Sequence, residues 1–260
     1  MRQKPKKNLG QNFLIDKNIQ EKIINACCLK ETDTVLEIGP GRGAITGLLL
    51  DMAKKVTAIE IDRALCTGLI EKFSGYPNFE LLNQDILKAD VSKYGKLKVI
   101  ANIPYYIATP IIAHLFQYRK HIEVICLMLQ KELANRVAAT PGTKDYGAFS
   151  CFVQFYSKAK ILFPIKRSSF WPQPKVDSSF VELRILSKPS VKVKDEAFFF
   201  KMIRLAFQQR RKLLKNSLAQ MAPQQRLIKY LKDIGIKQDA RAEDVSLADY
   251  AKLAAKIVST

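Results

Sequence analysis

The 260-residue chain has little of the chemistry that metal sites and catalytic triads require. It contains two histidines, and its five cysteines form no CxxC pair. Zinc sites and Ser-His-Asp triads depend on such residues. We therefore expect no metal site and no triad, and we interpret His114 and His121 as structural. The cysteines lie mostly in apolar segments, which indicates reduced thiols.

Long apolar runs and acidic residues are also scarce. No apolar run approaches the roughly 20 residues of a membrane-spanning helix, and the amino-terminal stretch has no signal-peptide core. We therefore expect a soluble, cytoplasmic protein without a membrane partner. The 24 Asp and Glu are outnumbered by 43 Lys and Arg, which gives a formal net charge of +19. Such an excess indicates a polyanionic partner, with nucleic acid as the leading candidate.

Strand-like and helix-like segments alternate in the first half of the chain. This alternation predicts a parallel, doubly wound α/β sheet with helices on both faces. The predicted strands span residues 35–38, 56–59, 79–82, 99–101 and 124–129. Further strands are expected at 152–156 and 180–185, and helices from near Asp16 and over 132–139.

The composition changes near residues 187–189, beyond which only helical patterns follow. We predict two domains, an α/β domain over 1–186 and a small all-α domain over 187–260. Residues 186–260 hold 16 Lys and Arg against 7 Asp and Glu, a net charge of +9. We interpret residues 208–212 as helical and, with Lys201, Arg204 and Lys215, as a contact for RNA phosphates. A solvated charged face is the alternative.

Polar residues mark the carboxyl ends of successive predicted strands. Glu37, Glu60, Asp85 and Asn102 each lie at or just past such an end. Ligands bind at this edge in open α/β sheets. We therefore expect these side chains to form one site.

A glycine-rich turn over residues 37–43 follows the first predicted strand and leaves room for a ligand close to the backbone. Gly39, Gly41 and Ala44 match the dinucleotide fingerprint, and Glu60 lies where a ribose-binding acid belongs. A nicotinamide oxidoreductase is therefore one interpretation. Glu37 beside the turn offers nothing to a pyrophosphate, but it suits a cationic sulfonium and an ammonium group.

Asn102, Pro104 and Tyr105 follow a short buried strand. An adenine amino group is a poor nucleophile, because its lone pair is delocalised into the ring. A site that alkylates it must accept hydrogen bonds from the amino group and hold the base flat. An amide, a turn-fixing proline and an aromatic ring supply these functions.

Taken together, the motifs resemble the ribosomal-RNA adenine dimethyltransferases, which include bacterial small-subunit, eukaryotic, mitochondrial and Erm-type enzymes. The resemblance covers nearly the whole chain, and the carboxyl-terminal residues 206–218 resemble the small-subunit branch. It rests on residues 8–14, 37–43, 60–62, 84–85, 102–106, 129–132 and 170–178.

This resemblance implies a Rossmann-like class I methyltransferase fold and a site for S-adenosylmethionine. The glycine turn, including Gly41, admits the methionine portion of this cofactor. The carbonyl of Ile103 or Pro104 joins Asn102 in binding the target amino group, and Tyr105 and Phe170 hold the target adenine. The residues implied to line the cofactor pocket are Asn12, Leu14, Gly39, Glu60, Asp85 and Asn102.

The resemblance further implies dimethylation of the amino nitrogen of two adjacent adenines near the end of small-subunit rRNA. The expected partner is this rRNA in a pre-30S particle, and we expect a monomer. A non-catalytic ribosome assembly factor would have the same fold and charge and remains an alternative.

Overall fold

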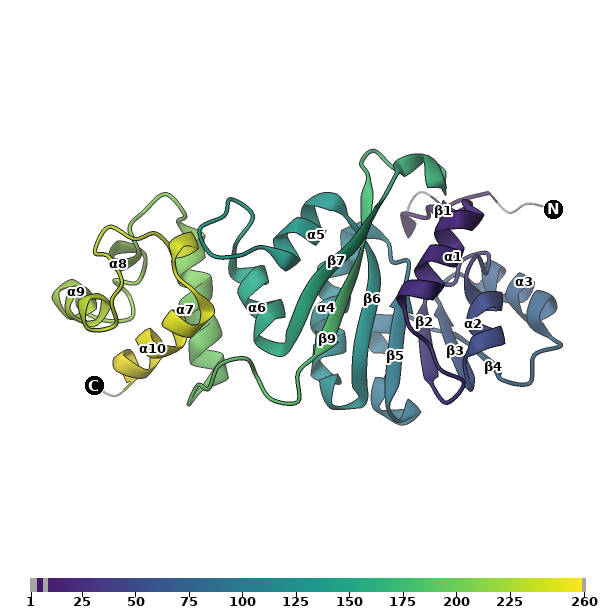
Figure 1. Cartoon of the computed structure of the whole chain (residues 1–260), viewed down its shortest axis with the longest axis horizontal. Helices are drawn as coiled ribbons and strands as arrows, with labels where there is room; N and C mark the ends of the chain where they lie inside the picture. The colour runs from purple at the N-terminus through teal and green to yellow at the C-terminus, as the bar shows by residue number, and fades with distance from the viewer. Residues whose placement is uncertain (1–3, 7–8, 259–260) are drawn as a thin grey trace. The chain divides into compact units, whose positions relative to one another are not determined.

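The computed structural model describes residues 4–6 and 9–258, so Asn8 of the amino-terminal motif at residues 8–14 lies outside the described residues. The chain divides into two compact units (Figure 1), Met1–Ala134 with Lys160–Ile185 and Asn135–Ala159 with Leu186–Thr260. This division differs from the predicted domains at residues 135–159, which belong to the second unit rather than the first.

The first unit is built on a sheet whose strands lie in the order β4-β3-β2-β5-β6-β9-β7. The strands from β4 to β6 are parallel to one another, and β9 pairs antiparallel with β6. The predicted parallel strands are confirmed. Their bounds are β2 (Thr34–Ile38), β3 (Lys55–Glu60), β4 (Phe79–Asn83), β5 (Leu97–Ala101) and β6 (Ile122–Gln130), followed by β7 (Ser157–Ile165) and β9 (Ser178–Ile185).

Helices cover both faces of this sheet. Ile23, Leu49 and Phe73, from three helices, share one buried cluster with Val35 and Val56 of the strands. Because side chains alternate along a strand, a second set of apolar residues faces the other side, where the buried face of α4 packs (Figure 1). The helices are α1 (Lys17–Ala26), α2 (Thr46–Met52), α3 (Arg63–Phe73) and α4 (Ala108–Gln117), with α5 (Lys131–Ala138) after β6.

A short antiparallel pair lies outside the main sheet. Strand β1 (Phe13–Leu14) pairs with β8 (Phe170–Trp171), so that Phe13 lies opposite Trp171 and Leu14 opposite Phe170. Asp16, the expected start of the first helix, caps α1 by accepting a hydrogen bond from the Ile19 amide at 3.3 Å. Short 3-10 turns span Ile86–Lys88, Val91–Tyr94, Tyr105–Ile107, Arg119–His121 and Arg167–Ser169.

The second unit is helical, with a core of aromatic rings. Phe152 and Phe155 of α6 pack against Phe200 and Phe199 of α7, with ring centroids 5.5 and 5.4 Å apart. The helices are α6 (Ala148–Tyr156), α7 (Glu196–Gln208), α8 (Leu214–Ser217), α9 (Gln224–Asp233) and α10 (Leu247–Val258), with a 3-10 turn at Ala242–Asp244.

The predicted strand at residues 152–156 is wrong, because these residues form the second half of α6. A short apolar run fits a buried strand or a buried helix equally well. The signal that distinguishes them is Ser150, whose hydroxyl accepts a hydrogen bond from the Gly147 amide at 3.0 Å and helps begin the helix.

The predicted helix over residues 208–212 is also wrong. Helix α7 ends at Gln208, and Gln209 has a non-helical backbone with φ −128° and ψ 62°. Arg210 Nη2 donates to the carbonyl oxygens of Lys144 and Tyr146 at 2.9 and 3.1 Å. Arg210, Arg211 and Lys212 are all exposed, but Arg210 also holds a turn of its own unit together.

Candidate functional site

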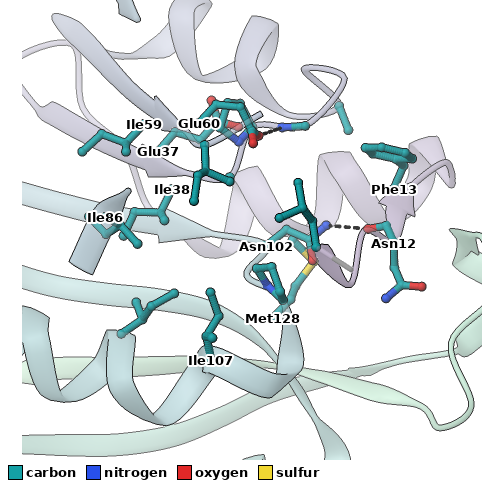
Figure 2. A pocket seen from close by; sticks show the side chains of 18 of the residues that line it. Asn12, Phe13, Glu37, Ile38, Ile59, Glu60, Ile86, Asn102, Ile107 and Met128 are labelled. Atoms are coloured by element: carbon teal, nitrogen blue, oxygen red, sulfur yellow. Dashed lines mark hydrogen bonds between the residues drawn. The ribbon is translucent and has the colours of Figure 1, made fainter. Parts of the chain in front are cut away.

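A cavity opens at the carboxyl ends of the parallel strands (Figure 2). Because β2, β3 and β5 are in register, Ile38 lies beside both Ile59 and Ala101, and the three strands end together. The side chains expected from the sequence therefore meet there. Among the residues that line the cavity are Asn12, Leu14, Glu37, Gly39, Gly41, Glu60, Asp85, Asn102 and Pro104.

The glycine turn forms one wall of the cavity. Gly39 and Gly41 have φ values of +67° and +60°, a left-handed conformation that favours glycine. A Cβ atom on Gly39 would lie 3.3 Å from the carbonyl oxygen of Asn102. The turn thus brings its bare backbone close to the end of β5 and leaves the cavity open to a ligand.

Glu60, at the end of the neighbouring strand β3, holds the backbone of this turn in place. Its Oε2 accepts a hydrogen bond from the Gly41 amide at 3.1 Å, and its Oε1 accepts one from the Asp62 amide at 2.9 Å. Burial raises the pKa of this carboxyl above its ordinary value, while the two amide bonds act in the opposite direction. Each oxygen has a further lone pair, so the carboxylate can also accept hydrogen bonds from ligand hydroxyls.

Asp62 ties the amino-terminal segment to the site. Its Oδ1 lies 2.8 Å from Lys6 Nζ, and its Oδ2 accepts a hydrogen bond from Gln11 Nε2 at 2.9 Å. Burial alone would raise the pKa of the Asp62 carboxyl. The hydrogen bonds from Lys6 and Gln11 outweigh this effect, so the pKa lies below its ordinary value. Asn12, Phe13 and Leu14, which follow Gln11, line the cavity, as the resemblance implied for Asn12 and Leu14.

Asn102 lies half-buried at the end of β5 and lines the cavity (Figure 2). Its Nδ2 donates a hydrogen bond to the Asn12 carbonyl at 3.2 Å. This bond sets the orientation of the amide and leaves Oδ1 as an acceptor. Asn102 therefore links the amino-terminal segment to the sheet.

Glu37 is buried in the floor of the cavity, with 2% of its surface exposed. Its Oε2 has no hydrogen-bond partner among the described residues. Burial raises the pKa of Glu37 to about 8. The side chain is therefore held neutral at pH 7, and a cation bound beside it would favour ionisation.

We expect Glu37→Gln to change how stability depends on pH. The pKa of Glu37 rises from 4.5 to about 8 on folding, so between these values the folded chain holds a proton that the unfolded chain releases. The free energy of unfolding therefore falls as pH rises from 4.5 to about 8. Glu37 contributes at most about 1.4 kcal/mol per pH unit to this fall. Urea unfolding from pH 5 to 8 should show a shallower decline for Glu37→Gln than for the native chain.

The control for this experiment is Glu71→Gln, which removes an exposed carboxyl from α3. The free energy of unfolding of Glu71→Gln should fall with rising pH as steeply as that of the native chain. An equal decline in all three proteins would contradict the protonation of Glu37.

Asp85 also lines the cavity. Its Oδ1 accepts a hydrogen bond from the Leu87 amide at 2.9 Å and caps the following 3-10 turn. The preceding Gln84 lines the cavity as well, and its amide donates to the Lys88 carbonyl at 3.3 Å. The carboxylate of Asp85 retains acceptor capacity for a ligand amino group.

Comparison with known proteins identifies the family. The family model described as ribosomal RNA adenine dimethylase matches residues 2–258. The chain belongs to this dimethylase family. The parallel sheet with helices on both faces is the class I methyltransferase fold of this dimethylase and of its solved relatives. A nicotinamide oxidoreductase and a non-catalytic factor are not favoured.

Several relatives of the dimethylase match it over nearly its full length. Ribosomal RNA small subunit methyltransferase A of Geobacillus thermodenitrificans is 42% identical, covering 95% of this chain and 89% of the relative. The corresponding protein of Clostridium acetobutylicum is 41% identical, and the match covers 96% of this chain and 93% of the relative. The solved dimethyladenosine transferase of Plasmodium falciparum matches with TM-score 0.82 and 28% identity, covering 95% and 98%. The 23S rRNA methyltransferase ErmE matches with TM-score 0.77 and 29% identity, covering 95% and 100%.

Two residues that the resemblance implied to hold a base do not line the cavity of this dimethylase. Tyr105 is partly buried, its hydroxyl lies 2.5 Å from Ser178 Oγ, and burial raises its pKa. Phe170 is 2% exposed and belongs to the buried cluster. The aromatic residues exposed nearby are instead their neighbours, Tyr106 at 63% and Trp171 at 45%.

The sequence interpretation did not identify Asp62, Tyr106 or Ser178 as functional. Asp62 in particular follows Glu60 by two residues and precedes a helix, a position where an Asp is usually explained as a helix cap. It does cap α3, by accepting from the Ala64 amide at 3.1 Å. Its second role depends on Lys6 and Gln11, which are far away in the sequence.

Within the described part of the chain, no group of His, Cys, Asp and Glu could hold a metal ion. No described helix is both long and apolar enough to cross a bilayer.

Proposed function

We propose that this protein transfers methyl groups from S-adenosylmethionine to the amino nitrogen of adenine, twice on each of two adjacent adenines near the end of small-subunit rRNA. The observation that carries this proposal is the Asn102 amide, oriented at the strand end in a cavity that the glycine turn and Glu60 also line. The small-subunit substrate is supported by the names of the relatives at 41–42% identity.

The residues of the cavity fit S-adenosylmethionine. Glu60 would accept hydrogen bonds from the ribose hydroxyls and Asp85 one from the adenine amino group. The bare backbone at Gly39 and Gly41 leaves room for the methionine portion. Glu37, buried with an oxygen that lacks a partner among the described residues, suits a cationic ligand. When bound, this cofactor supplies an electrophilic methyl group on a sulfonium sulfur.

The residues of the chain then position the target amine. Asn102 Oδ1 and the Ile103 carbonyl would accept the two amino hydrogens, which draws the nitrogen toward tetrahedral geometry and directs its lone pair at the methyl carbon. The Pro104 carbonyl already accepts a hydrogen bond from the Ile107 amide at 3.2 Å. Pro104 and the 3-10 turn that follows therefore fix the loop on which both acceptors lie.

The test is methylation of small-subunit particles from cells that lack this protein. Incubation with the purified protein and S-adenosylmethionine should add four methyl groups to the rRNA, found by mass spectrometry as two dimethyladenosines. Binding to the particle without any gain in mass would instead support a non-catalytic assembly factor.

We also propose that the partner is small-subunit rRNA in a pre-30S particle. The protein would bind this particle in the cytoplasm as a monomer. The positive charge of residues 186–260, a net of +9, would bind RNA phosphates. The exposed Arg211 and Lys212 are better placed for this than Arg210, which is bonded within its own unit.

We expect Arg211→Ala with Lys212→Ala to weaken RNA binding and to flatten its salt dependence. Each lost phosphate contact should lower the slope of log affinity against log salt by about 0.7. Binding to labelled rRNA is measured over a salt series. Arg210→Ala is the contrast, because it should lower the free energy of unfolding by about 1–2 kcal/mol. An unchanged slope for the double variant would show a passive surface.

A further inference from the structure

We propose that Trp171 and Arg42 form a subsite for the nucleotide next to the target adenine. The indole would stack on the neighbouring base, and the guanidinium would contact its phosphate. This inference rests on the proposed function, because it assumes an RNA substrate at the cavity. It assigns a role to two residues that the proposed function leaves without one.

The first support is the way the structure holds Arg42. Its Cζ atom lies 4.3 Å from the centre of the Phe13 ring and 5.0 Å from the centre of the Trp171 ring. Phe13 and Trp171 lie opposite each other in the β1–β8 pair. The guanidinium is therefore stacked against two rings that the backbone pairing fixes. A guanidinium is planar and carries five N–H donors, the geometry with which arginine binds phosphate.

The second support is exposure. Alternation along β8 buries Phe170 to 2% exposure and leaves Trp171 45% exposed. A large indole exposed to this extent beside a positive charge suits a nucleic-acid base, which has an apolar face and an anionic backbone.

The third support is position. Arg42 belongs to the glycine turn and lines the cavity. Tyr106, 63% exposed, also lines it. A base reaching Asn102 through this opening would carry its neighbouring nucleotides past Arg42 and past Trp171, whose ring centre lies 5.0 Å from the Arg42 guanidinium. The neighbour is the part of the substrate that these two residues can bind.

The chain offers a direct probe, because Trp171 is its single tryptophan. A short single-stranded RNA with two adjacent adenines should quench the tryptophan fluorescence, whereas S-adenosylmethionine alone should not. Replacing one of the adenines by an abasic nucleotide should remove most of the quenching. RNA that binds, as judged by anisotropy of a label, without quenching would overturn the proposal. Equal quenching by the abasic RNA would overturn it as well.

Variants test the energetic role. Trp171→Ala should raise the KM for RNA about tenfold, the usual scale of one base stack, with kcat and the Kd for S-adenosylmethionine unchanged. Trp171→Phe should retain most of the affinity. The matched control is Ile70→Ala, which removes another exposed apolar side chain, 58% exposed on α3, and should behave as the native protein.

Arg42→Ala and Arg42→Lys complete the test. Both should raise the KM for RNA, because lysine keeps the charge but not the planar stack. A weaker Kd for S-adenosylmethionine with an unchanged KM for RNA would show that Arg42 serves the cofactor, and would overturn the subsite. A native RNA KM in Trp171→Ala would also overturn it. Failure of the proposed function itself would be recognised separately, since the native protein would then transfer no methyl groups.

Discussion

Asn102→Ala is expected to lower kcat about a thousandfold, while the Kd for S-adenosylmethionine changes little. The amide oxygen is the acceptor that the end of β5 presents to the cavity, and its orientation is set by the Nδ2 bond to the Asn12 carbonyl. Loss of one oriented polar group at a reacting centre costs about 10²–10³ in rate. Single-turnover methylation and calorimetric cofactor binding measure the two quantities.

The matched control is Asn78→Ala. Asn78 is also half-buried, and its Nδ2 donates to the carbonyl oxygens of Leu50 and Ala53 at 2.9 and 3.0 Å, away from the cavity. This variant should lose stability but keep kcat. Near-native transfer by Asn102→Ala would refute the role of the amide.

Glu60→Gln is expected to weaken cofactor binding about a hundredfold. Both oxygens of Glu60 accept hydrogen bonds from backbone amides, at Gly41 and Asp62. A glutamine has one oxygen, so its NH₂ group must face one of these N–H donors. Hydrogen bonds to a charged group contribute about 1.5–3 kcal/mol each. The variant loses at least one such bond, and with it the geometry of the glycine turn and a hydroxyl acceptor.

Glu80→Gln is the control for this prediction. Glu80 accepts from the Thr57 hydroxyl at 3.1 Å and pairs with Lys55 at 2.7 Å, on the neighbouring strand and outside the cavity lining. Its Kd for S-adenosylmethionine should equal the native value. If calorimetry gave the same Kd for Glu60→Gln as well, the carboxylate would have no role in the cofactor site.

The parallel strands were predictable because each is a short apolar run bounded by helical patterns. The turn glycines and Glu60 were predictable for a similar reason, since they follow strand ends directly. The segment at 152–156 was not, because an apolar run alone does not distinguish a buried strand from a buried helix. Its helical state depends on Ser150 at the start of α6 and on the rings of α7.

The aromatic residues show the same limit. Tyr105 and Phe170 were assigned to the target base by resemblance, and neither is among the residues that line the cavity of the structure. Which of two adjacent rings is exposed depends on the face that each presents. That face is set by the partner, Ser178 for Tyr105 and the β1–β8 pairing for Phe170.

The sequence by itself determined the order of the strands along the chain, the strand-end position of Glu37, Glu60, Asp85 and Asn102, and the positive charge. These features are local, because hydrophobic period and turn chemistry depend on neighbouring residues. Only the tertiary structure decided which distant groups meet: Asp62 with Lys6 and Gln11, and Arg42 with Phe13 and Trp171. Such contacts depend on strand register and chain reversal, which bring together segments that no local pattern connects.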